Sequence, residues 1–212
     1  GGSLDVVLGF TPAVSDTFNI LNFASANGAG VTLNLGSPVG SFVTWDSSQL
    51  FIDGSLSVLS VVSPREWVTD GSGDWNLGSN WSSGTIPDSN ADNAIFGSAI
   101  TASRTVFTNT AVTVKSVQFD NANTYAIAGT GSVTLEADTG NASVDVLQGS
   151  HEFQVIVNLN SETDVSVAAG ASLSFNNSLN LNGDTLTKTG AGAMNINNQL
   201  NTGGGSVVIS AG

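Results

Sequence analysis

One acidic segment carries oxygen-bearing side chains at the spacing of a calcium-binding loop. In "DGSGDWN", which starts at Asp70, the first, third and fifth residues bear side-chain oxygens, and an asparagine follows at the seventh position. Two further aspartates lie a short distance downstream, where the chain can fold back toward the loop. The candidate calcium ligands are Asp70, Ser72, Asp74, Asn76, Asp88 and Asp92.

The same segment also has a simpler interpretation. The twelfth position of the loop is Trp81 rather than the bidentate glutamate of an EF-hand. Asp70 and Asp74 are also typical turn residues, whose carboxylates accept hydrogen bonds from their own backbone. We therefore expect no obligatory cofactor, and both interpretations of the acidic segment, calcium ligation and turn formation, stay open.

Residues for catalysis are sparse. His151 is the only histidine, so a zinc site built on paired histidines is not available. On a strand, His151 and the adjacent Glu152 would point to opposite faces, and we expect His151 to be a surface residue. The sequence has no G-x-S-x-G elbow, P-loop or dinucleotide fingerprint. The chain is therefore predicted not to be an enzyme.

The charge balance limits the classes of partner. The 212 residues include 17 acidic and 4 basic side chains, which gives a net charge of −13. Nucleic acids and anionic membrane surfaces need a cationic footprint, so we expect neither as a partner. No apolar stretch approaches the length of a membrane span, so membrane insertion is not expected either. With no cysteine in the chain, disulfides and thiol chemistry are excluded.

A short glycine-rich motif recurs and predicts the fold. "GTGSVTL" at Gly129, "AGASLSF" at Ala169, "TLTKTGAGAMNI" at Thr185 and "GGGSVVI" at Gly203 all place small residues before an apolar-polar-apolar run. In a β-solenoid, glycines form the corners, alternate side chains face inward, and asparagines at corresponding corners can form hydrogen-bonded ladders. An antiparallel sandwich with glycine-rich hairpins is the alternative. Lys188, within one copy, is expected on the solvated side.

The chain divides into three predicted regions. Residues 1–62 contain longer strand-like runs, including 50–53 before an Asp-Gly turn signal at Asp53, and are predicted to form an antiparallel β segment. Residues 63–97 form a connector or cap, in which three tryptophans are expected to build a small core at a solenoid end. Residues 98–212 are predicted to be a parallel β-solenoid. The expected fold is thus all-β, with a right-handed parallel β-helix.

The motifs resemble those of a known family. The residues that carry the resemblance are Trp75, Asn80, Trp81, Pro87, Asp92, Phe96 and the run "TLTKTGAG" from Thr185 to Gly192. Together they resemble the autotransporter-associated β-strand repeat proteins of bacterial surfaces, over roughly Trp67 to Gly212. The resemblance implies a secreted β-helical passenger with structural or adhesive work, located outside the cell or on its surface.

These observations favour a structural function. We expect a subunit or tandem-repeat unit of an extracellular bacterial fibre, sheath or adhesin stalk, with other copies of itself as partner and surface polysaccharide as a further candidate. A β-helical carbohydrate-binding or polysaccharide-cleaving protein is the alternative. Reading the final "SVVISAG" into the initial "GGSLDVVL" gives another copy of the glycine template. We therefore expect one period of a tandem array, or a subunit that stacks head to tail.

Overall fold

The computed structural model describes residues 3–10, 12–22, 32–36, 42–62 and 65–210. It is all-β, with 52% of the described residues in strands and one short 3₁₀ turn among them at Gly78–Asn80. The chain forms two compact units, Gly1–Pro64 and Arg65–Gly212. No helix in the described part of the chain is long and apolar enough to cross a membrane.

The described residues of the first unit form two small sheets. An antiparallel sheet has the order β2 (Thr17–Asn19), β5 (Ser55–Val62), β4 (Phe42–Asp46), which confirms the predicted antiparallel segment for these strands. A second sheet pairs β1 (Ser3–Val6) with β3 (Thr32–Leu35) in parallel. Parallel pairing needs a long crossover, and the connection between these two strands, which includes β2, supplies it.

One predicted strand of this unit is a turn. Residues 50–53 lie in the loop between β4 and β5, where the backbone N–H of Ile52 and of Asp53 both donate to the carbonyl of Gln49. Leu50 is fully buried, so its apolar character reflects packing under the loop and not a strand. Gly54 takes a positive φ of 89° directly before β5, as the Asp-Gly turn signal predicted.

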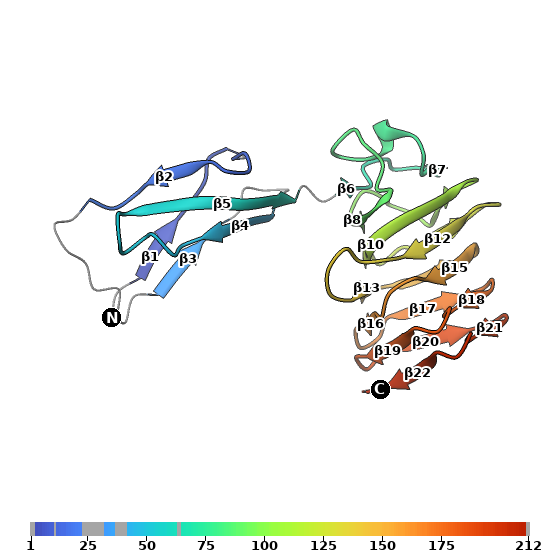
Figure 1. Ribbon diagram of the computed structural model, residues 1–212. Helices are drawn as coiled ribbons and strands as arrows, with labels where there is room; N and C mark the ends of the chain where they lie inside the picture. The colour runs from blue at the N-terminus through green and yellow to red at the C-terminus, as the bar shows by residue number, and fades with distance from the viewer. Residues whose placement is uncertain (1–2, 11, 23–31, 37–41, 63–64, 211–212) are drawn as a thin grey trace. The chain divides into compact units, whose positions relative to one another are not determined.

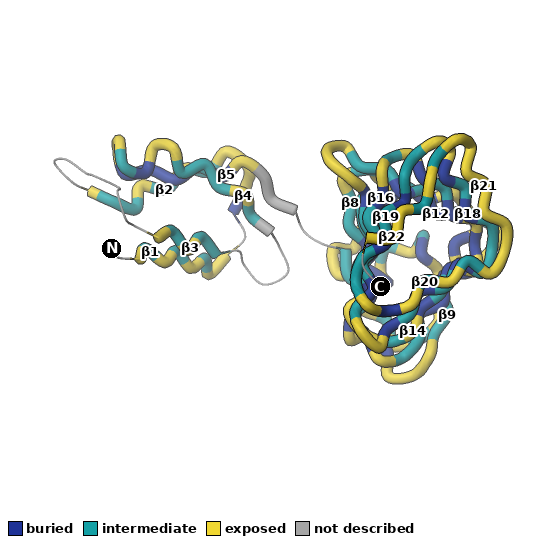
Figure 2. The backbone as a smooth tube through the Cα atoms, turned by 90° about the horizontal axis from the view of Figure 1, so that it is seen from below, coloured by how far each residue is buried: buried dark blue, intermediate teal, exposed yellow. Residues whose placement is uncertain are grey.

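The second unit is a parallel β-solenoid of about 6 turns. Figure 1 shows its strands stacked from β10 to β22, and Figure 2 shows the same coils superimposed along the stack. Most coils contribute three strands, one to each of the three faces of the stack. The first face contains β7 (Gly73–Asp74), β9 (Arg104–Phe107), β11 (Tyr125–Ala128), β14 (Ser150–Phe153), β17 (Ser172–Phe175) and β20 (Ala193–Ile196).

The other two faces join through one long strand. The second face contains β12 (Ser132–Leu135), β15 (Ile156–Leu159), β18 (Leu179–Asn180) and β21 (Leu200–Asn201). The third contains β6 (Arg65–Glu66), β8 (Ser89–Phe96), β13 (Ala142–Gln148), β16 (Thr163–Val167), β19 (Thr185–Thr189) and β22 (Ser206–Ile209). The strand β10 (Ala111–Asp120) pairs with β12 through its first half and with β8 and β13 mainly through its second half.

The register of the strands builds the core. Val133 pairs with Val157 and Val157 with Leu179, so apolar residues of successive coils lie directly above one another. On the first face, Phe153 stacks on Phe175 with ring centroids 5.5 Å apart. These side chains are at most 1% exposed, while the residues between them face outward. The apolar-polar-apolar runs therefore line the interior, as the sequence predicted.

The structure explains why two positions of "TLTKTGAG" are glycine. Gly190 has a φ of 75°, and a Cβ added there would collide with the carbonyl of Val167 in the preceding coil. At Gly192 φ is not positive, but an added Cβ would collide with the carbonyl of Ala168. The corner after β19 thus needs glycine once for backbone conformation and twice for close approach of the coils.

We predict that Gly190→Val and Gly192→Val each destabilise the protein by about 2 kcal/mol or more, because overpacking against backbone cannot relax cheaply. Urea denaturation followed by circular dichroism measures the change. The matched control is Gly71→Val, since a Cβ at Gly71 meets only the Thr69 methyl group at 3.6 Å. Wild-type stability in both corner variants would contradict the assignment of this corner.

Candidate functional site

The tryptophan-rich segment closes one end of the solenoid core. Trp67, Trp75 and Trp81 are each at most 2% exposed and belong to the same apolar cluster as the coils. The ring centroids of Trp75 and Trp81 lie 5.0 Å apart, and those of Trp75 and Phe96 lie 5.5 Å apart. Within the described ranges, β6 and β7, which precede Trp67 and Trp75, each pair with one strand. Residues 65–97 therefore act as an aromatic cap that is continuous with the core.

The indole N–H groups of this cap all have acceptors. Trp67 Nε1 donates to the carbonyl of Thr69 at 2.8 Å, Trp75 Nε1 to that of Pro87 at 2.9 Å, and Trp81 Nε1 to that of Trp75 at 2.7 Å. A buried indole without an acceptor would cost free energy, so these bonds let three tryptophans pack together in one small volume.

His151 lies inside the solenoid, so the prediction of a surface histidine was wrong. Its side chain is 2% exposed and stacks on Phe119, with ring centroids 4.7 Å apart. The residue alternates along β14 with the outward Glu152, which places His151 on the same side as the buried Phe153. The separation of His151 from Glu152 by the strand is as expected.

Both ring nitrogens of His151 are used by the backbone. Nδ1 accepts from the backbone N–H of Tyr125 at 3.1 Å, which leaves Nε2 to donate to the carbonyl of Gln148 at 2.9 Å. This arrangement requires the neutral ring with its proton on Nε2. Burial lowers the pKa of His151 below its usual value, because the charged ring would lose its hydration.

Lys188 also faces inward, contrary to the expectation of a solvated position. It is 4% exposed and lies opposite Val165 of the preceding coil. Its Nζ donates to the carbonyl of Gly190, at the corner that follows β19. Lys188 shares its side of the strand with Leu186, which is fully buried. Lys188 therefore stabilises the corner from within.

An asparagine ladder runs along strands on the outside of the stack, whereas the sequence predicted such ladders at the corners. On the second face, Asn201 Nδ2 donates to Asn180 Oδ1 and Asn180 Nδ2 donates to Asn158 Oδ1, both at 2.7 Å. The paired residues are 21 and 22 positions apart in the chain, one coil in each case. Each amide thus acts as donor to one coil and acceptor from the next.

Two further ladders include a carboxylate. Asn197 Nδ2 donates to Asn176 Oδ1 at 2.8 Å, and Asn176 Nδ2 donates to Glu152 Oε2 at 2.6 Å. At another corner, Glu136 accepts from Asn90 and from Asn160, at 3.2 Å in both cases. Acidic side chains are thus placed where amides of neighbouring coils satisfy them.

The structure holds the predicted calcium ligands in other interactions. Asp70 accepts hydrogen bonds from the backbone N–H of Thr101 at 3.0 Å and from its hydroxyl at 2.7 Å, and it pairs with Arg104 Nη2 at 3.3 Å. The Thr101 contacts also hold the pKa of Asp70 below its usual value. Asp74 Oδ1 accepts from the backbone N–H of Asn76 at 2.8 Å, which is the turn interpretation.

Two of the six candidate ligands contact each other. The backbone N–H of Asp88 donates to Asp92 Oδ2 at 3.0 Å, and Asp92 also forms an ion pair with Arg65. Asp88 Oδ1 accepts from the backbone N–H of Thr113 at 2.8 Å, in the next coil. This pair is therefore part of the contact between coils.

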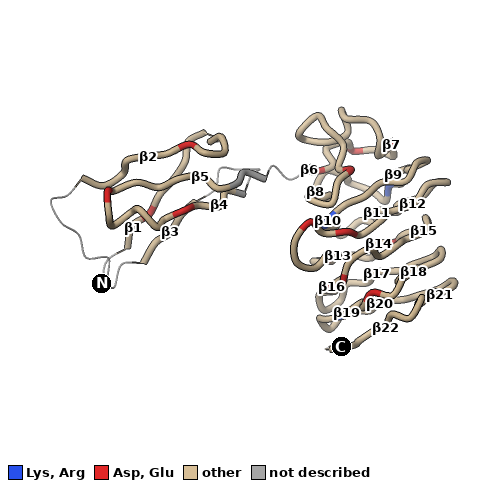
Figure 3. The backbone as a smooth tube through the Cα atoms, viewed as in Figure 1, with Lys and Arg blue, Asp and Glu red and all other residues tan. Residues whose placement is uncertain are grey.

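The remaining two candidates reach the next coil separately. Ser72 Oγ accepts from the backbone N–H of Thr105 at 3.0 Å, and Asn76 Nδ2 donates to Thr110 Oγ1 at 2.9 Å. Within the described ranges, no three or more histidine, aspartate or glutamate side chains gather at a spacing that would hold a metal ion. Figure 3 shows the acidic residues scattered along both units. Calcium binding stays a prediction from the sequence.

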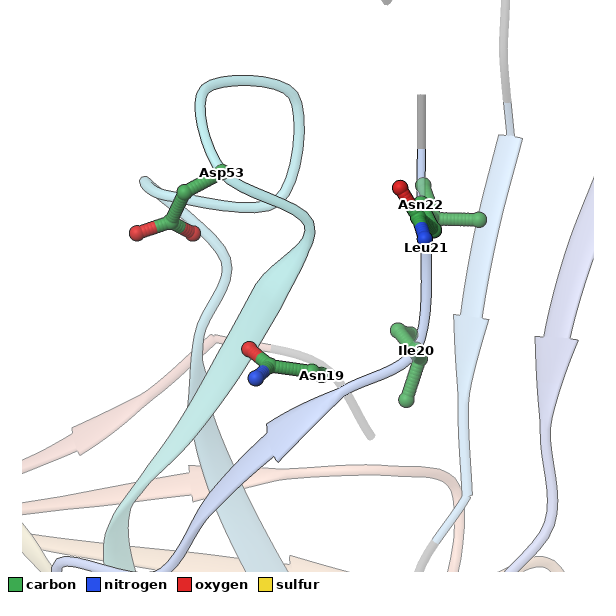
Figure 4. Close-up of a pocket in the computed structure, with 5 residues that line it drawn as sticks. All are labelled: Asn19, Ile20, Leu21, Asn22 and Asp53. Atoms are coloured by element: carbon green, nitrogen blue, oxygen red, sulfur yellow. The ribbon is translucent and has the colours of Figure 1, made fainter. Parts of the chain in front are cut away.

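The surface hollows carry little chemistry. One of about 420 Å³ in the first unit is lined by Asn19, Ile20, Leu21, Asn22 and Asp53 (Figure 4). The carboxylate of Asp53 is already bound by the N–H and hydroxyl of Ser55, at 3.0 and 2.6 Å. A second hollow, of about 230 Å³, lies over β14 and β17 and is lined by Thr124, Ser150, His151, Glu152, Ser172 and Ser174. Glu152 there is already bound by Asn176 and Gln154.

The coil formed by β20, β21 and β22 differs from the others. Its inward residues Met194, Ile196 and Val207 are only partly buried, whereas Leu186 one coil earlier is fully buried. Ile209, which continues the inward series, is 60% exposed. Each of the three strands has one neighbour among the described residues. This coil presents a strand edge and apolar side chains together, and it is the feature of the solenoid best suited to binding another strand.

We predict that acid destabilises the protein through His151. Because its folded pKa lies below the unfolded value of about 6.5, its contribution is complete above that pH and is lost as the pH falls through the folded pKa. The cost is at most about 1.4 kcal/mol per pH unit for one proton. His151→Leu should be less stable than the wild type at pH 7.5, because it loses both hydrogen bonds, but it should lack this slope. Melting midpoints from pH 7.5 to 5 measure it, and parallel curves would contradict it.

A second prediction concerns the asparagine ladder. In Asn180→Asp the carboxylate cannot donate to Asn158 Oδ1, so we expect a loss of about 1–2 kcal/mol in unfolding free energy. Asn195→Asp is the matched control, because the hydrogen bond that Asn195 Nδ2 donates to Ser174 Oγ is long at 3.4 Å and exposed. Urea denaturation of both variants at pH 7 provides the measurement. Equal losses would show that charge, and not the ladder, causes the effect.

The chain matches no protein-family model, and none of the curated proteins or solved structures compared with it is similar. The resemblance to autotransporter-associated repeats therefore stays a prediction from the motifs, and the fold rests on the structure itself.

Proposed function

We propose that the protein is a structural module of an extracellular bacterial fibre, sheath or adhesin stalk, which extends by stacking head to tail. The observation that carries this proposal is the asymmetry of the solenoid. The aromatic cap closes the core at one end, while the coil of β20, β21 and β22 leaves strand edges and apolar side chains uncovered.

The construction of the coils supports a mechanical role. Most coils are bonded to their neighbours by parallel backbone ladders on three faces, and asparagine hydrogen bonds and aromatic stacking add side-chain contacts in the same direction. Such a stack resists bending because displacement of one coil must break bonds on all of its faces at once. Further coils can be added to such a stack through the same contacts.

The surface also supports this assignment. The described carboxylates of the hollow over β14 and β17 and of the hollow beside β2 are held by neighbouring amides and hydroxyls. A carboxylate so engaged is a poor general acid or base, since catalysis needs a free group aimed at a substrate. The geometry therefore favours a scaffold over polysaccharide cleavage.

Electron microscopy of the purified protein in negative stain tests the proposal. We expect rods or filaments that lengthen with protein concentration, with a coil spacing of about 4.8 Å in fibre diffraction. Compact particles that do not lengthen over a hundredfold range of concentration would contradict it. Turnover of an acidic polysaccharide by the same preparation would favour the carbohydrate-active alternative.

A further inference from the structure

The first unit contains a pair of strands that looks like part of a stack. β1 and β3 are parallel, with Leu4 opposite Leu33 and Val6 opposite Leu35. In both strands exposed and half-buried residues alternate, and the half-buried ones are apolar. A two-stranded parallel sheet is marginal alone, because parallel strands are normally covered on both faces. β1 and β3 therefore have the pairing and pattern of two solenoid rungs that have no further neighbour among the described strands.

We call the side of β22 that faces away from β19 the open edge. The direction of the backbone N–H and C=O groups shows which residues of β22 point to it. Ser206 and Ser210 donate their N–H groups to the carbonyls of Asp184 and Lys188, at 3.3 and 2.9 Å. Backbone groups alternate in direction along a strand, so those of Val207 and Ile209 point to the open edge. They need a partner strand whose own groups point back.

β1 offers backbone groups at the matching positions. The carbonyl of Val6 accepts from Gly36 N at 2.9 Å, so Val6 points toward β3. By alternation Leu4 also points toward β3, and Ser3 and Asp5 point to the free side. In a parallel ladder a residue bonds to the two residues that flank its opposite number, as Ser206 does across from Thr185. Val207 opposite Leu4 would thus bond to Ser3 and Asp5.

The same register matches the side chains. It places Ser206 opposite Ser3, Val207 opposite Leu4 and Ile209 opposite Val6. Hydrogen-bond direction alone requires this parity, yet it also brings the uncovered apolar residues of β22 onto the half-buried apolar residues of β1. The two serines would continue the hydroxyl contact already made by Thr185 and Ser206, whose oxygens lie 3.4 Å apart.

We propose that β22 of one copy pairs in parallel with β1 of a second copy, with Ser206 opposite Ser3. This inference rests on the proposed head-to-tail function and names the strand that receives the open edge. The third face of the solenoid then continues from β16, β19 and β22 into β1 and β3 of the next copy. Because different surfaces of the chain meet, each copy can bind one further copy at each end, and repetition of the contact extends the stack.

Cross-linking tests the register directly, because the chain has no cysteine. Ser206→Cys and ¹⁵N-labelled Ser3→Cys are prepared separately, mixed in equal amounts and oxidised mildly. We expect the mixed disulfide, identified by mass spectrometry, to exceed both self-disulfides at least fivefold. Val208→Cys with Ser3→Cys is the matched control, since it lies on the same face two residues out of register. Equal yields from the two mixtures would overturn the proposal.

A proline at the open edge tests the hydrogen bonds. Ile209→Pro removes an N–H that points to the open edge and no donor to β19, so its unfolding midpoint should stay near that of Ile209→Ala. We expect the proline variant to weaken association at least tenfold in sedimentation velocity, relative to the alanine variant. Equal association would overturn the proposal. If filaments form but Ser206→Cys and Ser3→Cys give no preferential mixed disulfide, this pairing is overturned while the proposed function still holds.

Discussion

The parallel hydrogen bonding between successive coils is the constraint on which the rest of the structure depends. It sets each coil in register with the next, so residues of similar character lie opposite one another. Val157 lies opposite Leu179 inside the stack, and Asn180 is hydrogen-bonded to Asn201 on the outside. Which side chain fits at a position therefore depends on the residues of the preceding and following coils more than on its neighbours along the chain. This is why glycine at Gly190 and Gly192 matters through carbonyls of the preceding coil.

The solenoid was readable from the sequence because its signal is local. A glycine corner followed by an apolar-polar-apolar run specifies one strand of a coil, and the repetition of that run specifies stacking. His151 and Lys188 were misassigned although the same alternation contained the answer, since they share their strand side with Phe153 and Leu186. Their polarity suggested solvent, but backbone groups of Tyr125, Gln148 and Gly190 satisfy them inside.

The acidic segment shows what spacing in a sequence does not contain. Asp70 and Asp88 find their partners, Thr101 and Thr113, one coil away. Those contacts depend on coil length, which varies with each corner, so they cannot be counted from one end of the motif. The parallel pairing of β1 with β3 was missed for a related reason: the two strands are separated by a long connection, and alternation alone does not give direction.

The aromatic cap has a consequence for how the molecule comes apart. Coils that touch only their neighbours lose structure one at a time, and loss begins where the fewest contacts must break. Amide hydrogens of the coil with Met194 and Val207 would then exchange with solvent first, and those beside Trp75 and Phe96 last. The aromatic cap therefore holds one end of the stack closed, and opening proceeds from the other end. A second copy seated on the loose end would slow the exchange of every coil behind it.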